Sequence, residues 1–264
     1  MTALYTSQVW AWGQLSHAEL FATTDAKRVF AVTNAALGIA RLVRRDLPSL
    51  RFALLHRHTM IDHLLRASGC DRVVELAAGL SRRGAAFCGM YDYTDIDLPP
   101  VIAHKRALLE RTSAGREVLA KLHLVAADVR DVDLVALAGL GAPRPFVIAE
   151  GLLIYLDRDA RRRLFARVAD VADTFVFDLV PASEEPEPGA IGRVLEAGMK
   201  RFTGGRGFER DAHTRDDVID ELIAAGFTSA RAIAARDVAR QWQLPHAERD
   251  TNTVVFSASR STRV

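Results

Sequence analysis

From Asp71 onward, short apolar segments alternate with helical stretches, and this alternation constrains the fold more than any other feature of the sequence. The expected strands lie in RVVELA (72–77), GMYDYTDID (89–97), LHLVAAD (122–128), PFVIAEGLLIYL (145–156), TFVFDLV (174–180), SARAIAA (229–235) and NTVVFSAS (252–259). Strands that alternate with helices in this way pair in a parallel sheet. The pattern therefore predicts an α/β fold whose sheet is covered by helices.

The chain before this alternation is predicted to form a helical N-terminal cap, residues 1–70, in front of a sheet domain, residues 71–264. One helix is expected in TTDAKRVFAVTNAALGIARLV with Asp25 as its N-cap, and another in SLRFALLHRHTMIDHLLRASG with Gly69 at its C-terminal end. Late in the sheet domain, an acidic, proline-rich segment precedes a glycine-rich one. We expect a lid insertion at about residues 181–213, with a plain surface loop as the alternative.

Composition narrows the possible partners. Lysine and arginine total 35 and aspartate and glutamate 33, and a net charge of +2 gives no support for nucleic-acid binding. Cys70 and Cys88 are too few for a disulfide framework or a zinc cluster, so we expect no metal site. No apolar stretch reaches about 18 residues and no secretion signal is evident, so we expect a cytoplasmic protein without a membrane partner. The oligomeric state is not indicated.

The segment DRVVELAAGLSRRGAAF (71–87) combines a strand, a turn of small residues and a helix start. Small residues let a ligand approach the backbone, and a helix N-terminus offers free N–H groups. The glycine spacing of a dinucleotide site is absent, because Ala77, Ala78 and Gly79 are followed next by Gly84. The sequence also lacks the phosphate-binding loop of nucleoside triphosphatases. This turn therefore favours a nucleoside without phosphates.

Acidic residues end four successive predicted strands: Glu75, then Asp95 and Asp97, then Asp128, then Glu150. Ligands of open α/β sheets bind beyond the carboxyl ends of the strands, and an acid about 20 residues after the first strand commonly holds ribose hydroxyls. Taken singly, each acid could cap a helix or turn. The series favours S-adenosylmethionine, because an acidic rim attracts its cationic sulfonium and amino groups.

The motifs VVELAAGLSRRG, DIDLPPVIAHKRALL, AADVRD and VIAEGLLIYL, in this order and spacing, resemble those of the leucine carboxyl methyltransferase family, most closely its bacterial polyketide O-methyltransferase branch. The resemblance extends from LHRHTMIDHLL to RFTGGRGFERDAHTR. It implies a Rossmann-like, class I methyltransferase sheet, mostly parallel with an antiparallel last strand. It also implies an S-adenosylmethionine-dependent O-methyltransferase acting on a carboxylate or hydroxyl of a small, aromatic or polyketide-like molecule, in secondary metabolism.

By the same resemblance, Arg57 binds the carboxylate of the cofactor's methionyl group, assisted by Lys27, and Asp97 holds the ribose hydroxyls. Asp128 and Val129 would contact adenine. The remaining implied cofactor residues are Glu75, Ala77, Ala78, Gly79, Arg83 and Glu150, the last lying beneath the sulfonium and amino groups.

The chain departs from the family pattern at Ala77, where glycine is usual, and the added methyl group narrows the room for a ligand. Arg83 matches the arginine of the family before Gly84, whereas Arg82 stands where a small polar residue is common. We therefore expect Arg83 in the site and Arg82 at the surface. His56 and His58 are expected to be exposed, without a metal role.

A carboxylate acceptor needs no general base, whereas a hydroxyl does, and His213 is the candidate base, with a surface histidine as the alternative. Tyr155, Arg201 and Arg206 are the other polar groups expected near the acceptor. Two other functions stay open at this point. A dinucleotide-dependent oxidoreductase would show cofactor absorbance, and a non-catalytic binding protein, which Ala77 favours, would give no heat of binding with S-adenosylmethionine.

Overall fold

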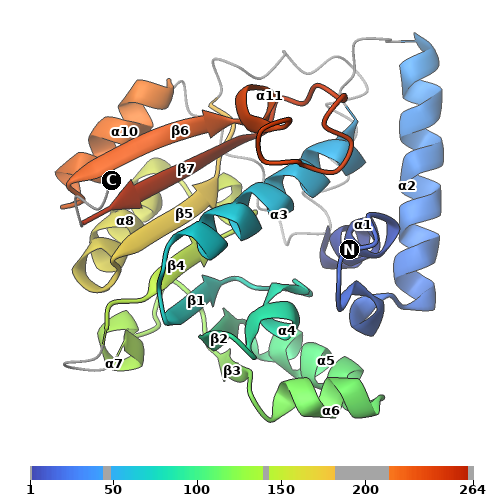
Figure 1. Cartoon of the computed structure of the whole chain (residues 1–264), viewed down its shortest axis with the longest axis horizontal. Helices are drawn as coiled ribbons and strands as arrows, with labels where there is room; N and C mark the ends of the chain where they lie inside the picture. The colour runs from blue at the N-terminus through green and yellow to red at the C-terminus, as the bar shows by residue number, and fades with distance from the viewer. Residues whose placement is uncertain (1, 44–48, 139–142, 182–213, 261–264) are drawn as a thin grey trace.

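The computed structural model describes residues 2–43, 49–138, 143–181 and 214–260, which build a seven-stranded sheet (Figure 1). The strands run in the spatial order β3-β2-β1-β4-β5-β7-β6. Their bounds are β1 Arg72–Leu76, β2 Asp92–Asp97, β3 His123–Ala126, β4 Phe146–Ala149, β5 Thr174–Asp178, β6 Ser229–Ala234 and β7 Val254–Ser259. Each strand lies within one of the predicted apolar segments.

Strands β1 to β5 pair in parallel, and β7 is antiparallel to both of its neighbours, β5 and β6. This confirms the predicted mostly parallel sheet with an antiparallel last strand. From β1 the chain moves outward to β2 and β3, and then returns to place β4 on the other side of β1. The switch in direction opens a crevice beyond the carboxyl ends of β1 and β4, where ligands of such sheets bind.

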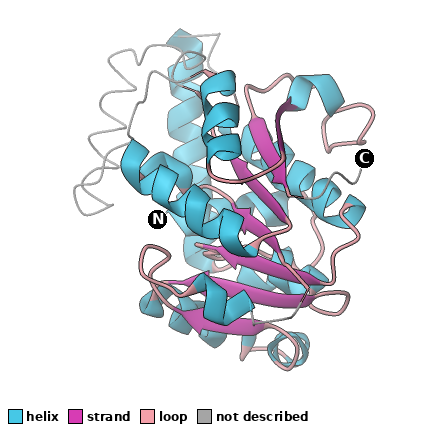
Figure 2. Cartoon of the chain, turned by 90° about the vertical axis from the view of Figure 1, so that its left-hand side faces the viewer, coloured by secondary structure: helices cyan, strands magenta, loops and turns pink. Residues whose placement is uncertain are grey.

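Helices lie on both sides of the sheet (Figure 2). The α-helices are α1 Thr2–Trp12, α2 Thr24–Val43, α3 Leu50–Ala67, α4 Arg83–Phe87, α5 Pro99–Leu109, α6 Ser113–Leu119, α7 Leu134–Ala138, α8 Arg158–Val171, α10 Arg215–Ala224 and α11 Ala235–Val238. Two 3-10 helices are η1 Ala18–Phe21 and η2 Leu153–Tyr155. Among the described helices, none is long and apolar enough to cross a membrane.

The side chains of each strand point alternately to the two faces of the sheet, and the hydrophobic core therefore has two layers. Val73 of β1 belongs to a buried cluster that includes residues of α3, α4 and α5, whereas its neighbour Val74 belongs to a second cluster with α8 and α10. Successive side chains of a strand point to opposite faces, so one strand serves both layers. Since α3 shares its core with β1, it packs on the sheet itself, while α2 packs chiefly on α1 (Figure 1).

Two helix ends test the predicted caps. The Thr23 hydroxyl accepts a hydrogen bond from the Ala26 backbone N–H at 3.1 Å, so Thr23 caps α2 and the predicted cap, Asp25, lies in the first turn. Threonine takes this position because it precedes the first helical residue, where a side-chain oxygen can reach a free N–H. Gly69 follows α3 with φ of 64°, the left-handed geometry expected after a helix. Residues 182–213 of the predicted lid lie outside the described residues.

Candidate cofactor site

A cavity of about 370 Å³ lies at the carboxyl ends of β1, β2 and β4. Its walls include the turn at residues 77–81 after β1, Asp97 at the end of β2, residues 150–152 after β4, and Arg57 of α3. The volume falls in the range of small-molecule sites, about 300–1,000 Å³. Of the predicted cofactor residues, the cavity brings together Arg57, Glu75, Ala77, Ala78, Gly79, Asp97 and Glu150.

The turn after β1 has a backbone geometry that explains why glycine is usual at position 77 in the family that the motifs resemble. Ala77 and Gly79 both have φ of 52°, a left-handed conformation. The Ala78 N–H donates to the Ile96 carbonyl at 3.1 Å, which ties the turn to β2. A side chain in this conformation costs roughly 1–2 kcal/mol, so Ala77 is strained where glycine would not be.

Asp97 holds the turn from the end of the next strand. Its Oδ2 accepts from the Gly79 N–H at 2.6 Å and its Oδ1 from the Leu98 N–H at 2.7 Å. Burial raises the pKa of Asp97, although both backbone bonds oppose that rise. A carboxylate has about four lone-pair positions, so two remain for other donors, such as a pair of ribose hydroxyls.

Glu150, directly after β4, accepts three hydrogen bonds. Arg57 Nε donates to Oε1 at 2.9 Å, and His58 Nδ1 and Arg83 Nη2 lie 2.8 and 2.7 Å from Oε2. Burial by itself raises the pKa of Glu150, but the His58 contact and the charges of Arg83 and Arg57 outweigh it and hold the pKa well below its usual range. The side chain is therefore an anion fixed in place by donors from α3 and α4.

Arg83 is fully buried and connects three elements. Its Nε donates to Asp62 at 2.7 Å, its Nη1 to Glu75 at 2.6 Å and its Nη2 to Glu150. Tyr93 donates to the other Glu75 oxygen at 2.6 Å. Arg83 is predicted to bind the cofactor, yet it is not among the described residues that line the cavity. The structure places it behind the wall, where it holds Glu75 and Glu150.

Arg82 is buried, and the expectation that it is exposed is wrong. It is 2% exposed, forms an ion pair with Asp62, and donates to His58 Nε2 at 3.1 Å and to the Ser16 hydroxyl at 3.3 Å. Burial lowers the pKa of Arg82 to about 10. Its position follows from the packing of α3 over the start of α4, which brings Asp62 within reach of two adjacent arginines.

His56 and His58 are also buried, contrary to expectation. His56 lies 2.9 Å from the Pro245 carbonyl and 3.1 Å from the Thr251 hydroxyl, so it links α3 to the segment before β7. The Trp10 ring of α1 stacks on His58 with centroids 4.0 Å apart. The cause is that α3 lies between α1 and the sheet, so that its polar residues facing these elements are enclosed.

The protonation of His58 follows from its neighbours. Arg82 Nε can only donate, so a neutral His58 accepts at Nε2 and carries its proton on Nδ1, which lies 2.8 Å from Glu150 Oε2 and also 3.0 Å from Arg83 Nη2. Burial and the charge of Arg83 hold the pKa of His58 well below its usual value, despite Glu150. His58 is therefore a neutral donor to Glu150 near neutral pH.

Besides Arg83, three further predicted cofactor residues are not among the described residues that line the cavity. Lys27 is exposed on α2. Strand β3 ends at Ala126, two residues before the predicted end at Asp128, whose carboxylate pairs with Arg130. The Val129 carbonyl accepts from Arg167 at 2.9 Å. Their predicted contacts with the cofactor remain predictions.

Of the residues predicted to lie near the acceptor, one is among the described residues and three are not. Tyr155 lines the cavity. Arg201, Arg206 and His213 lie outside the described residues. The strand-end acid Asp95 is fully buried and pairs with Lys105 of α5 at 2.5 Å, so it has a structural partner rather than a place at the cavity.

Sequence reasoning missed two parts of the site. Helix α1 contributes Thr2, Ala3, Thr6 and Trp10 to the cavity wall, and its sequence carries no motif that would have indicated this. Asp178 ends β5 and accepts from Arg57 Nη1 at 2.9 Å. The same strand-end pattern that predicted the other acids also applied to Asp178.

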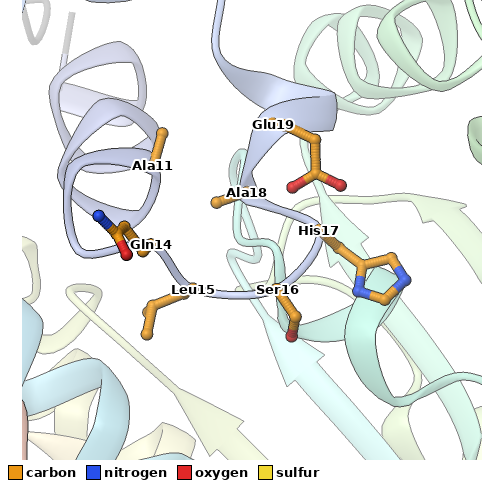
Figure 3. Close-up of a pocket in the computed structure, with 7 residues that line it drawn as sticks. All are labelled: Ala11, Gln14, Leu15, Ser16, His17, Ala18 and Glu19. Carbon is orange, nitrogen blue, oxygen red and sulfur yellow. The ribbon is translucent and has the colours of Figure 1, made fainter.

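A second cavity, also about 370 Å³, lies between the end of α1 and η1 (Figure 3). Its described lining residues all lie within 11–19, with Ala11 and Gln14 on one side and Ala18 and Glu19 on the other. It therefore lacks the strand ends and the acids from separate elements that characterise the first cavity. Among the described residues, no group of three or more histidine, cysteine, aspartate or glutamate side chains is placed to hold a metal ion.

The charge around the first cavity matches S-adenosylmethionine. The connected buried network contains three arginines (Arg57, Arg82, Arg83) and four carboxylates (Asp62, Glu75, Glu150, Asp178). With His58 neutral and all four carboxylates ionised, it carries one net negative charge. The cofactor carries one net positive charge, from a sulfonium, an ammonium and a carboxylate. These arginines and carboxylates, together with the spare acceptor positions on Asp97, fit the charged groups and the ribose of this cofactor.

Known proteins that resemble this chain are described as methyltransferases, which agrees with a site for S-adenosylmethionine. A family model described as leucine carboxyl methyltransferase matches residues 14–169. A Mycolicibacterium paratuberculosis protein named as a candidate S-adenosyl-L-methionine-dependent methyltransferase is 33% identical over 178 residues, covering 62% of this chain and 56% of that protein. A Mycobacterium tuberculosis protein of the same description is 41% identical over 107 residues, covering 38% of this chain and 33% of that one. The chain thus spans at most about half the length of these relatives.

Solved structures share the fold. A candidate O-methyltransferase of Nostoc punctiforme has a TM-score of 0.54 at 15% identity, covering 79% of this chain and 59% of that one. The magnesium protoporphyrin IX methyltransferase of Synechocystis, solved with S-adenosylhomocysteine (SAH) bound, has a TM-score of 0.52 at 16% identity, covering 85% of this chain and 95% of that one. The comparisons confirm the predicted family, the Rossmann-like fold and S-adenosylmethionine as the cofactor.

Proposed function

Because the chain belongs to the leucine carboxyl methyltransferase family, we propose that it transfers the methyl group of S-adenosylmethionine to an oxygen of a small-molecule acceptor. The observation that carries the proposal is the cavity at the switch point of the sheet, with Asp97 at one end and Arg57 and Glu150 at the other. These groups come from β2, α3 and the residue after β4, and they match the hydroxyl and charged groups of one extended nucleoside ligand.

Each end of the cavity has its own task in the proposed site. The free acceptor positions of Asp97 receive the ribose hydroxyls. The described residues occupy two of the five N–H donors of Arg57, and the others are available to the methionyl carboxylate. The negative network around Glu150 favours the sulfonium and ammonium groups.

In the proposed reaction, the protein mainly positions the cofactor and the acceptor relative to each other, and acid–base chemistry contributes less. The bound cofactor would supply an activated methyl group for in-line attack by an acceptor oxygen. Residues around the cavity hold the two reactants and exclude water. Trp10 and Leu152 form part of the apolar wall, and Tyr155 offers a hydroxyl nearby.

We propose oxygen rather than nitrogen as the acceptor atom. Many amino-group methyltransferases carry an N/D-P-P-Y/F motif after the fourth strand, whereas this chain has AEGLLIYL (149–156) there. Between oxygen acceptors we favour the carboxylate of a small aromatic or polyketide-like acid, bound by Arg201 and Arg206. A hydroxyl acceptor would instead depend on His213 as general base.

Cofactor binding is tested by calorimetric titration of the full chain with SAH. We expect Asp97→Ala to weaken binding by about 1.5–3 kcal/mol, the magnitude of hydrogen bonds to a charged group. Asp92→Ala is the matched control, because Asp92 lies at the other end of β2 in an exposed pair with Arg72. Equal affinity in folded Asp97→Ala and wild-type proteins would refute the ribose assignment.

The acceptor atom is tested by transfer of a radiolabelled methyl group to a panel of small aromatic and polyketide-like acids, phenols and amines. A methyl ester releases labelled methanol in mild alkali, whereas a methyl ether or methylamine does not. We expect alkali-labile product. Labelled product that resists alkali would exclude the carboxylate, and separation of ethers from amines would then decide between hydroxyl and nitrogen acceptors.

A further inference from the structure

Asp178 binds two groups that meet at the cavity, although it is not itself among the described residues of the lining. Its Oδ2 accepts from Arg57 Nη1 at 2.9 Å, and its Oδ1 accepts from the Gly151 N–H at 2.5 Å. The side chain is largely buried at the end of β5. It therefore fixes both the Arg57 guanidinium and the backbone that passes beside it.

The approach of Gly151 to this guanidinium is close. Gly151 has φ of 68°, and a Cβ built there would lie 3.3 Å from Arg57 Nη2 and 3.5 Å from Nη1. A methyl group here would be tight against Nη2 and would also have to adopt the left-handed backbone conformation that glycine tolerates best. Asp178, Gly151 and Glu150 thus surround Arg57 on several sides, and they determine which of its N–H groups remain directed at the cavity.

We propose that Asp178 is a positioning residue, which orients Arg57 toward the methionyl carboxylate and so makes the site select the complete cofactor over its nucleoside portion. The inference rests on the proposed function. A long arginine side chain has many rotamers, and binding a ligand with one that is already fixed avoids the cost of ordering it. Asp97 serves the nucleoside, whereas Asp178 acts through Arg57 on the amino-acid end.

The electrostatic setting of Arg57 supports this role. Burial by itself lowers the pKa of Arg57, but Asp178 and Glu150 more than offset that, and the guanidinium stays charged. Without Asp178, the Nη1 donor would lose its carboxylate and the Gly151 N–H its acceptor. The guanidinium would then be free to turn fully toward Glu150, away from the ligand.

The test compares two ligands on the full-length protein, SAH and 5′-methylthioadenosine, which has the same nucleoside but no amino-acid group. For Asp178→Asn we expect SAH binding to weaken about tenfold to a hundredfold, the loss typical of one charge-assisted hydrogen bond. Binding of 5′-methylthioadenosine should stay within about threefold of wild type. Asp97→Ala is the matched control and should weaken both ligands, because both contain the ribose.

Gly151→Ala provides a second, independent variant, since its methyl group would press on Arg57 from the other side, and it should show the same selective loss. Thermal unfolding of each variant establishes that it is folded. A merely structural role for Asp178 would weaken both ligands in parallel, and that result, or unchanged affinity for both, would overturn the inference while leaving the proposed function intact. Failure of the wild-type protein to bind either ligand would overturn both.

Discussion

All three nitrogens of the Arg83 guanidinium donate to carboxylates, which come from α3, from β1 and from the residue after β4. Removing one partner of a buried ion pair typically costs about 3–5 kcal/mol, because the other charge is left without compensation. The adjacent Arg82 shares Asp62 with it. At the residue scale, the arginine pair of SRRG therefore secures the strand ends, and the predicted contact of Arg83 with the cofactor remains a prediction.

Ala77 leads to a prediction at the same scale. Replacing it with glycine removes the strain of a left-handed alanine, roughly 1–2 kcal/mol, but adds about 0.4–1 kcal/mol of unfolded-chain entropy. We expect Ala77→Gly to raise the free energy of unfolding by about 0.5–1 kcal/mol in urea titrations, and SAH to bind as tightly or more tightly.

Ala78→Gly is the matched control for this substitution. Ala78 is not among the described residues with positive φ, so glycine there gains no relief from strain and should destabilise the fold by about 0.5–1 kcal/mol. If both glycine variants lost stability equally, the left-handed strain at Ala77 would not be the controlling factor.

At the scale of elements, α1 and α3 enclose the site together. Helix α3 contributes His58 and Asp62, which bind the two arginines, and Arg57, which binds the acid after β4 and the acid that ends β5. Helix α1 then covers His58 with Trp10, which also lines the cavity. The helical segment before the sheet is thus as much a part of the site as the strand ends are.

Substituting each of the two tryptophans of α1 in turn distinguishes the contribution of this helix to ligand binding from its contribution to packing. Trp12 stacks on His246 at 5.4 Å and is not among the described lining residues, whereas Trp10 is. We expect Trp10→Phe to weaken SAH binding about threefold to tenfold, consistent with the 0.5–1.5 kcal/mol of an aromatic contact. Trp12→Phe should bind as wild type does.

Tryptophan fluorescence gives the same comparison a second readout. The chain has three tryptophans, and only Trp10 lines the cavity among the described residues. Addition of SAH should change the fluorescence of the wild-type and Trp12→Phe proteins and leave that of Trp10→Phe nearly constant. A ligand-dependent signal that persists in Trp10→Phe would argue against α1 as part of the site.

At the scale of the whole molecule, the sequence predicted the sheet well, because apolar periodicity directly reflects which residues a strand buries. It also predicted that Asp97 and Glu150 meet at one cavity, since parallel strands place their carboxyl ends together. The burial of Arg82 and His58 could not be predicted in this way. It depends on how α1 and α3 cross the strand ends, and side-chain partners from distant segments leave no periodic signal.

The buried network also determines how the stability of the whole protein depends on pH. Folding holds the pKa of His58 well below its ordinary value, so below about pH 6.5 the unfolded chain binds a proton there that the folded protein does not. Stability is therefore lost as pH falls, by up to about 1.4 kcal/mol per pH unit for one such group. Glu150, with its lowered pKa, adds to the loss at lower pH. Glu75 and Asp178, with pKa values raised by burial, oppose it.

His58→Gln isolates the histidine contribution, because glutamine can still donate to Glu150 and accept from Arg82 but does not titrate. His56 and His63, whose pKa values are also lowered, are present in both proteins and contribute equally. We expect the variant to be less stable than wild type at pH 7.5, because its packing against Trp10 is poorer, but to lose less further stability between pH 6.5 and 5.5. The measurement is the free energy of unfolding by urea at half-unit pH steps. Parallel profiles for the two proteins would show that His58 is not the neutral, buried donor that its contacts with Arg82 and Glu150 indicate.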